Sequence, residues 1–509
     1  MNQSYQKAFL ICLFIMVFLT CLLRFPSDDS LRHVGLAFGN FTSWGDAYPF
    51  SIFAEFKDYN PWFGYDLSLR LIASALKQLP TSFISLLTLK FLFTKALSLL
   101  FALGFFYLVL VKSSLLDDTK DRDSFTLVLI ILLAFLAFPL SRIVIARPFA
   151  LGTFFLIYSV GQKGIGRGFL SSLVLAFFYP YLCWFYILPV AFAHLIKGDK
   201  KFALGGILFI ILFLFLQPTS FWGFQVALVK SDIVRGAINA KIREFHSTLK
   251  FFPFYIYLAG FIILYPKFSK DVRRLSYLNI LILIYLVPAL KYLRYFCDLT
   301  LPLLFISFGK ELIQIMDEPY RKLIASWGTT VQGGFEKIKS TINIRAVKIR
   351  DAESTKSAGA GRSLKPYITI SYMLIFALII HINIGQIRSL KGLQDTLAPV
   401  PAGSLILASF NLQYEALYLR PDLRVIPSCE MGFAGRDISK EYVNFFNDGL
   451  IRPLSRKTGA EYFLENKKTY VNPQDGKFLK LLKENARFKL WKILCPKKAD
   501  YDRITKKSK

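Results

Sequence analysis

The segment that follows the first apolar run concentrates the residues that could do chemistry. Between residues 24 and 82 the chain carries six acids, at Asp28, Asp29, Asp46, Glu55, Asp58 and Asp66. Asp28 and Asp29 come only a few residues after the apolar run, which places them at the membrane surface. A carboxylate beside an apolar phase tends to have a raised pKa and is suited to act as a base. A sugar hydroxyl that attacks an anomeric carbon is one group that needs such a base, and Asp28 and Asp29 are candidates for this role.

Neighbouring residues could assist this base, and each also has a plainer role. If residues 28–40 form a helix, Asp29 shares a face with Arg32 or His33, and Arg32 and His33 could stabilise a phosphate leaving group. Asp29 could equally be the N-cap of that helix, and capping does not exclude catalysis. Asp46 is a further candidate for substrate binding. The adjacent acids Asp28 and Asp29 could also hold Mg²⁺ or Mn²⁺, since both ions prefer oxygen ligands.

The aromatic residues of the same segment leave two interpretations open. Trp44, Tyr48, Trp62 and Tyr65 are spaced through it. They could form a belt at the membrane interface, where such side chains are enriched. Alternatively, they could stack on a sugar.

Two basic motifs later in the chain could bind a phosphate. Arg142 and Arg147 lie in the motif SRIVIARPF, and Arg294 and Tyr295 lie in KYLRYFCDLTLP. Charges at membrane depth are functional candidates because burying them is expensive, and two guanidiniums suit a phosphate or pyrophosphate. The alternatives are that the arginines reach the outer headgroups, or that Arg294 pairs with Asp298 one helical turn away.

The composition indicates whether these residues belong to a soluble or a membrane protein. The chain has 509 residues, of which 54% are hydrophobic and 19% charged, with a net charge of +29. Typical soluble domains carry about 25% charged residues, so the composition argues against a soluble enzyme, and its hydrophobicity excludes disorder. About eleven apolar runs are consistent with spans: 8–23, 83–111, 125–141, 149–160, 169–182, 184–196, 202–217, 251–265, 275–290, 296–309 and 366–385. Several are shorter than the roughly 20 residues that a perpendicular helix needs.

The charged loops predict an orientation and a domain plan. Lys and Arg gather in loops that are cytoplasmic if the N-terminus is cytoplasmic, and an odd number of spans then places the C-terminus outside. We predict a bundle over 1–309 with its first extracytoplasmic loop at 24–82, a basic cytoplasmic loop at 310–365, a last span at 366–385, and an extracytoplasmic α/β domain at 386–509. The basic loop fits anionic lipid headgroups better than nucleic acid, because no aromatics are interleaved with it.

The C-terminal domain is predicted to alternate strands and helices. Strands are expected at 404–409, 423–427, 460–466 and 487–494. Helices are expected at 412–419, at 439–450 with Ser439 as its cap, and at 477–486.

This layout resembles the GT-C superfamily of membrane glycosyltransferases. The similar features are the acidic loop FPSDDSLRHV directly after the first span, the paired short helices that end in Leu-Pro (ILPVAF), the late span RYFCDLTLPLLF, and PAGSLILAS at the start of a terminal domain. The resemblance implies transfer of a sugar from a polyprenyl phosphate or pyrophosphate at the outer face, with an acid of the first loop as the catalytic residue. That role would fall on Asp28 or Asp29. No clean DxD or ExD motif is present, which leaves metal dependence open.

The sequence therefore predicts an α-helical polytopic membrane protein of the bacterial inner membrane with a small C-terminal α/β domain on the periplasmic side. Its predicted partners are a lipid-linked sugar donor, membrane lipids, and a glycan, lipid or protein acceptor, with no nucleic acid. Three other interpretations remain open: a polysaccharide polymerase or ligase fed by lipid-linked sugars, a transporter or flippase, and a structural protein of an envelope assembly. Transport would be favoured if Lys90 and Lys95 lined a central channel.

Overall fold

The computed structural model describes most of the chain. The described residues are 3–24, 29–80, 85–113, 127, 131, 136, 138–230, 247–250, 254–255, 257, 276–309, 312–322, 365–409, 412–426, 435, 438–467 and 473–494. Within these ranges some side chains, including those of residues 29 and 365–377, lie outside the description. Asp28 and most of two predicted spans, 125–141 and 251–265, also lie outside the described residues.

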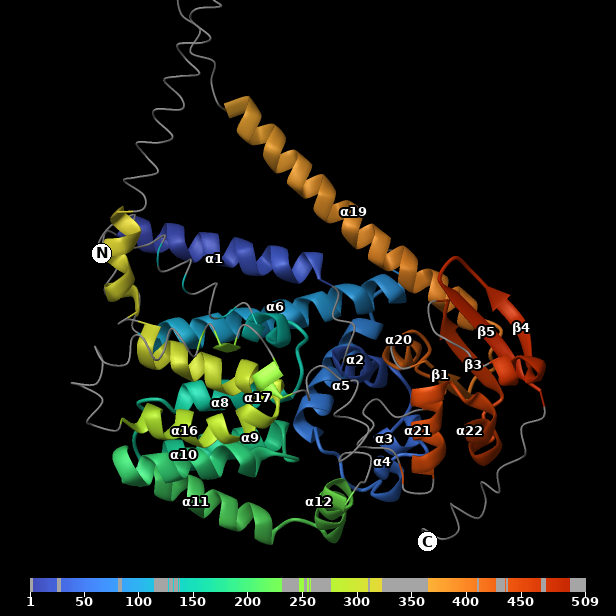
Figure 1. Ribbon diagram of the computed structural model, residues 1–509, viewed down its shortest axis with the longest axis horizontal. Helices are drawn as coiled ribbons and strands as arrows, with labels where there is room; N and C mark the ends of the chain where they lie inside the picture. Colours follow the sequence, from blue (N-terminus) through green and yellow to red (C-terminus); the bar gives the residue numbers. More distant parts are fainter. Residues whose placement is uncertain are drawn as a thin grey trace, which may run out of the picture.

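Apolar helices packed side by side form the bundle (Figure 1). The long helix α6 contains no proline, and its 28 residues extend over about 42 Å at 1.5 Å per residue, enough to cross a bilayer. The helices and short helical turns of the bundle are α1 (Gln3–Leu23), α6 (Leu86–Ser113), α8 (Phe149–Ser159), α9 (Ile165–Phe178), α10 (Cys183–Lys197), α11 (Lys200–Phe215), α12 (Thr219–Lys230), η3 (Thr248–Lys250), α16 (Tyr277–Lys291), α17 (Leu293–Tyr295), the π-helical turn η4 (Phe296–Thr300) and α19 (Lys365–Leu397).

The structure does not confirm the predicted count of about eleven spans. Among the described residues, one helix, α6, is long and apolar enough to cross a membrane, and up to three spans result if each of two bent helix pairs is one span. One such pair is α11 and α12, which meet at a bend of 98°. Pro218 lies at this break, where it cannot donate the hydrogen bond that would continue the helix. Five further apolar helices have 10–17 residues, which agrees with the short runs in the sequence.

The acidic segment after α1 folds into four helices. They lie at the end of the bundle that is remote from the N-terminus (Figure 1). The predicted helix over 28–40 is confirmed as α2 (Asp29–Phe38), which begins at Asp29 itself. It is followed by α3 (Trp44–Ala47), α4 (Ile52–Glu55) and α5 (Phe63–Lys77). Residues 31–38 of α2 are buried without exception, so this helix lies inside the molecule and not on its surface.

A five-stranded sheet forms the core of the C-terminal domain, in the order β2-β1-β3-β5-β4. Strand β1 (Leu405–Ala408) pairs in parallel with β2 (Arg424–Ile426) and β3 (Tyr462–Asn466), whereas β5 (Phe488–Ile493) is antiparallel to β3 and to β4 (Leu479–Glu484). Side chains of one face pack with α19 and α20 (Gln413–Leu419), and those of the other face pack with α21 (Ser439–Asp448) and α22 (Ile451–Thr458). A 3₁₀ turn, η7 (Pro473–Phe478), precedes β4.

Two details of this domain correct the sequence-based expectations. The segment 477–486 was expected to be a helix, but residues 479–484 form β4, which pairs with β5 at the edge of the sheet. Its Lys, Leu and Glu residues are good helix formers, and the backbone pairing offered by β5 overrides that preference. Ser439 was expected to cap a helix, but α21 begins at Ser439 and its N-cap is Ile438.

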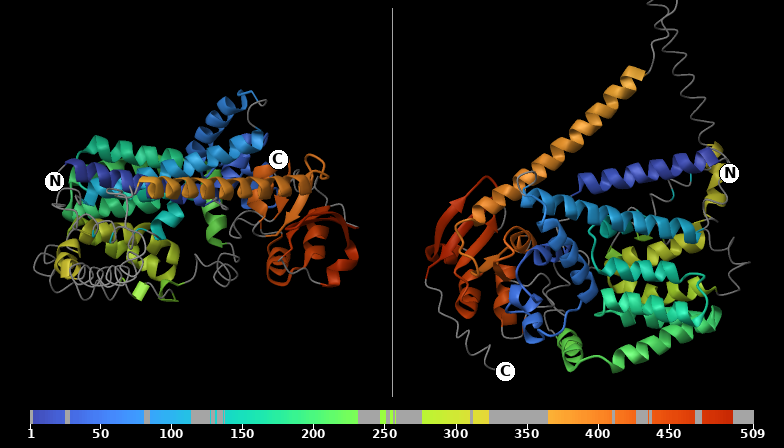
Figure 2. Two further views of the ribbon diagram at one scale, coloured as in Figure 1. Left: turned by 90° about the horizontal axis from the view of Figure 1, so that it is seen from above. Right: turned by 180° about the vertical axis from the view of Figure 1, so that it is seen from behind.

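Helix α20 of the C-terminal domain packs against the bundle. Gly35 of α2 lies so close to α20 that a Cβ atom there would sit 2.8 Å from the carbonyl oxygen of Leu417. Lys90 of α6 donates a hydrogen bond to the carbonyl oxygen of Tyr418 over 2.9 Å. Helix α19 provides the covalent connection, and the two further views show it running to the sheet at one end of the molecule (Figure 2). Its Gln386 amide donates to the carbonyl oxygen of Leu23 at the end of α1.

Candidate functional site

A buried carboxylate, Asp66, joins three segments of the acidic region. His33 Nδ1 and Asp66 Oδ1 are hydrogen-bonded over 2.6 Å. The indole of Trp44 and the amide of Asn60 donate to Asp66 Oδ2 over 2.7 Å and 2.9 Å. Asp66 and His33 are each 1% exposed. This network fixes α2 against α5, and therefore fixes the helix that begins at Asp29.

Aromatic rings enclose His33 and Arg32. The rings of Trp44, Trp62 and Tyr65 lie edge-on to the His33 ring, with centroids 4.9–5.1 Å away. The Arg32 guanidinium lies 4.5 Å from the centre of the Trp62 ring and is almost fully buried. All three aromatic side chains are buried, as is Tyr48. They therefore form neither a lipid-facing belt nor an exposed platform for a sugar; they form the packing around the Asp66 network.

Asp46, a predicted substrate-binding residue, forms a capping box at the start of α3. The Ser43 hydroxyl accepts from the Asp46 backbone N–H, and Asp46 Oδ2 accepts from the Ser43 N–H, the Ser43 hydroxyl and the Thr42 hydroxyl. Partial burial works to raise the pKa of Asp46, but the hydrogen bonds from Ser43 and Thr42 outweigh it and lower the pKa. The carboxylate is thus held in its ionised form by local structure.

We expect Asp46→Ala to lower the free energy of unfolding by about 1 kcal/mol, as is usual when a cap is lost. The contribution of the carboxylate is complete above the unfolded pKa of about 3.9 and disappears as the pH falls through the lower folded pKa. Equilibrium unfolding of the detergent-solubilised protein at neutral pH and near pH 3 measures both effects. Asp46→Asn, which keeps an acceptor oxygen, is the control. Equal stability of all three proteins at neutral pH would contradict the expectation.

Three arginines from two distant segments of the chain lie near one another beyond the end of α1. Arg24 follows α1, and its guanidinium donates to the carbonyl oxygen of Ser141 over 2.7 Å. The pKa of Arg24 is lowered, first by partial burial and then by the positive charges of Arg147 and Arg142. Like charges lower the pKa of a cation only when they are near it. The cluster formed by Arg24, Arg142 and Arg147 is called the arginine cluster below.

An acid and a fourth arginine border this cluster. Arg142 Nε donates to Asp298 Oδ1 over 2.5 Å, and the Asp298 side chain is 3% exposed. Asp298 was expected to pair with Arg294 one helical turn away, and it contacts Arg142, a residue 156 positions away. The Arg294 guanidinium lies 4.9 Å from the centre of the Phe149 ring and 5.1 Å from that of the adjacent Tyr295. The structure therefore brings the motifs around 142 and 294 together, as the sequence-based hypothesis requires.

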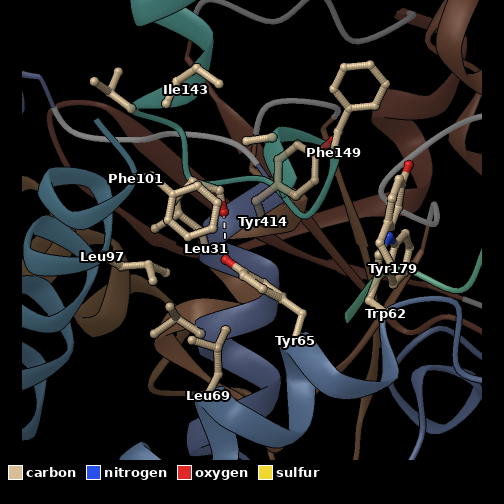
Figure 3. Close-up of a cluster of buried hydrophobic side chains, with 14 of the residues drawn as sticks. Leu31, Trp62, Tyr65, Leu69, Leu97, Phe101, Ile143, Phe149, Tyr179 and Tyr414 are labelled. Atoms are coloured by element: carbon tan, nitrogen blue, oxygen red, sulfur yellow. Dashed lines mark hydrogen bonds between the residues drawn. The ribbon is translucent and has the colours of Figure 1, made fainter. Parts of the chain in front are cut away.

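A strained turn connects the arginine cluster with the Asp66 network. Ala146 has φ +53°, a left-handed conformation that costs about 1–2 kcal/mol for a residue with a Cβ. The Tyr65 hydroxyl donates to the Ala146 carbonyl oxygen over 2.6 Å, marked by the dashed line in Figure 3. The same figure shows Leu31 of α2, Phe101 of α6, Ile143, Phe149 and Tyr414 of α20 in one cluster around this contact. The start of α2, the 141–149 turn and the C-terminal domain therefore meet here.

Lys90 and Lys95 hold structural elements together. Lys95 donates to the carbonyl oxygens of Cys21, Leu22 and Arg24, which closes the C-terminal end of α1. Lys90 binds α20 as described above. Both side chains are buried and bonded to main-chain oxygens. These contacts give no support to the transport hypothesis.

The proposed base and the proposed metal site remain sequence-based predictions. Asp28 lies outside the described residues, and the side chain of Asp29 is also outside them. Among the described residues, no group of three or more His, Cys, Asp or Glu side chains could hold a metal ion. Binding of Mg²⁺ or Mn²⁺ at Asp28 and Asp29 is therefore untested.

Several residues of the site were not assigned a role from the sequence. Asp66 was counted among the acids of the segment, but nothing in its local sequence signals that three donors converge on it. Asn60 and Arg24 carry no motif. The contact of Tyr65 with Ala146 joins residues 81 positions apart, which no local pattern could reveal.

Comparisons with known proteins show a distant similarity of fold. No protein-family model matches the chain. No curated protein matches it either. Among solved structures, it is similar to the crystal structure of ArnT from Cupriavidus metallidurans bound to undecaprenyl phosphate, with a TM-score of 0.42 and 13% identity, over 95% of this chain and 97% of that chain.

Proposed function

We propose that this protein is a glycosyltransferase of the bacterial inner membrane that takes a sugar from a polyprenyl phosphate or pyrophosphate on the periplasmic side. The observation that supports the proposal is the arginine cluster: Arg24 is hydrogen-bonded to Ser141 beside Arg142, and the charges of Arg142 and Arg147 act on it. Arg24 follows α1, α2 begins five residues later at Asp29, and the turn that carries Arg142 and Arg147 accepts a hydrogen bond at Ala146 from Tyr65 of α5. A base and an anion site would then occupy the same end of the bundle.

The charges of the cluster suit a lipid-linked phosphate. Guanidiniums donate bidentate hydrogen bonds to phosphate oxygens. Positive charges that are held together repel each other, and an anion placed between them removes that repulsion. Arg142 is paired with Asp298, and Arg24, Arg142 and Arg147 are together proposed to contact the anion. Arg294 remains a proposed binding residue at the border of the cluster.

The chemistry follows from this placement. Asp28 or Asp29 would accept the proton of the acceptor hydroxyl while its oxygen forms a bond to the anomeric carbon. The bond between the anomeric carbon and the phosphate oxygen would break, and the lipid phosphate would leave with both bonding electrons. Arginines near the leaving oxygen would stabilise its developing charge. The C-terminal domain, which reaches the site through α20, would shape the acceptor side.

The binding half of this proposal is tested with undecaprenyl phosphate and undecaprenol, which differ only in the phosphate. We expect the wild-type protein in detergent to prefer the phosphate, and Arg147→Gln to weaken binding of the phosphate by roughly 10–100-fold, the loss of one or two charge-assisted hydrogen bonds. Binding of undecaprenol should stay unchanged. Isothermal titration calorimetry measures the four affinities, of each protein for each lipid.

Arg167→Gln provides the matched control. Arg167 is an exposed arginine of α9, outside the arginine cluster. Its replacement removes the same charge and should leave both affinities as in the wild type. If Arg167→Gln and Arg147→Gln weaken binding equally, the effect comes from net charge and the proposed phosphate site is wrong.

A further inference from the structure

The turn that carries Arg142 and Arg147 is held from both sides by side chains of other segments. At its start, the carbonyl oxygen of Ser141 accepts from Arg24. At its other end, the carbonyl oxygen of Ala146 accepts from the Tyr65 hydroxyl of α5 over 2.6 Å. Tyr65 is 4% exposed and Ala146 is fully buried, so this bond lies away from water. Without the Tyr65 hydroxyl, the buried Ala146 carbonyl oxygen would lose this hydrogen bond, and water could not replace it.

Because of the backbone conformation of Ala146, the hydrogen bond from Tyr65 affects the direction of the Arg147 side chain. Alanine is disfavoured at φ +53° and returns to φ < 0 unless its surroundings prevent it. Because Ala146 immediately precedes Arg147, a change in its backbone angles would redirect the Arg147 side chain relative to Arg142. The bond from Tyr65 therefore opposes the change that would separate the two guanidiniums.

We propose that Tyr65 is a positioning residue for binding of the phosphate, because its hydroxyl holds the 141–147 turn in the conformation that gathers the arginine cluster. The inference rests on the proposed function. Tyr65 adjoins Asp66, which fixes α2 through His33. One turn of α5 thus positions both the helix of the predicted base and the turn of the predicted anion site.

The test uses Tyr65→Phe in the full-length protein, with farnesyl phosphate and farnesol as soluble probes. The substitution keeps the ring and its packing and removes only the hydroxyl. We expect the Kd for farnesyl phosphate to rise about tenfold, as for loss of one well-placed hydrogen bond, while the Kd for farnesol is unchanged. In a transfer assay the KM for the lipid donor should rise by a similar factor, with kcat within about twofold of the wild type.

Tyr285→Phe is the matched control, because the Tyr285 hydroxyl also donates to a main-chain oxygen, that of Phe185. It should change thermal stability as much as Tyr65→Phe and leave the Kd for farnesyl phosphate unaltered. Equal affinity of Tyr65→Phe and wild type would overturn the inference, as would an equal loss for farnesol or for Tyr285→Phe. If the wild type itself does not prefer the phosphate, the proposed function fails together with the inference.

A second variant tests the role of backbone strain. Glycine adopts φ > 0 without steric cost, so Ala146→Gly should bind farnesyl phosphate like the wild type. Adding Ala146→Gly to Tyr65→Phe should recover part of the lost affinity. With glycine at position 146 the left-handed conformation is not strained, so the turn would relieve no strain by leaving it. A double variant that binds more weakly than Tyr65→Phe would contradict the positioning role assigned to this conformation.

Discussion

Replacing both Asp28 and Asp29 by Asn is expected to lower the rate of sugar transfer by roughly 10²–10⁴-fold, the usual contribution of a general base. Asparagine has a similar shape but cannot accept a proton, so binding of the lipid phosphate should persist. The two single variants will show which of the two acids is the base. The measurement is the rate of transfer from a polyprenyl phosphate sugar, followed as a function of pH. In the active proteins the acid limb of the profile should report the ionisation of the base.

Asp58→Asn is the control for this experiment. Asp58 belongs to the same acidic segment and is exposed, so its replacement should leave the rate near that of the wild type. Size-exclusion chromatography before and after heating would establish that the double variant is folded. Normal transfer by a well-folded double variant would mean that neither acid is the base.

The second large effect is expected for Asp66→Ala, which should lower the free energy of unfolding by about 3–5 kcal/mol. This loss corresponds to leaving several buried polar groups without a hydrogen-bond partner, at about 1–3 kcal/mol each. His33, the indole of Trp44 and the amide of Asn60 would all lose the carboxylate to which they are hydrogen-bonded. Equilibrium unfolding in mixed detergent micelles measures the change.

Asp66→Asn serves as the comparison for this prediction. It preserves the volume and one acceptor oxygen, so it should destabilise the protein less than Asp66→Ala. The capping variant Asp46→Ala should be milder still, because Asp46 is partly solvated and its partners can bond to water. A loss below about 1 kcal/mol for Asp66→Ala would show that the network contributes little to stability.

The secondary structure of this protein could be read largely from local patterns. The apolar runs at 83–111, 149–160 and 184–196 became α6, α8 and α10, and four of the five strands were anticipated. Strand β4 was not, because its backbone pairs with β5 whereas its Lys and Leu residues favour a helix on their own. The predicted count of about eleven spans is not confirmed: the described residues contain one helix long and apolar enough to cross a membrane, or up to three spans if each bent helix pair is one span.

The sequence by itself determined the kind of molecule and the types of chemistry it can hold: apolar helices, an acidic segment after the first of them, and two basic motifs. Composition and the periodic spacing of apolar residues indicate these features, because both depend only on residues that are near one another along the chain. Only the tertiary structure decided which of these residues meet. Asp66 with His33, Arg24 with the 141–147 turn, and Tyr65 with Ala146 are contacts between segments that packing brings together, and hydrogen bonds and charges act only over a few ångströms. The role of each charged residue therefore depends on the residue that it contacts in the folded protein.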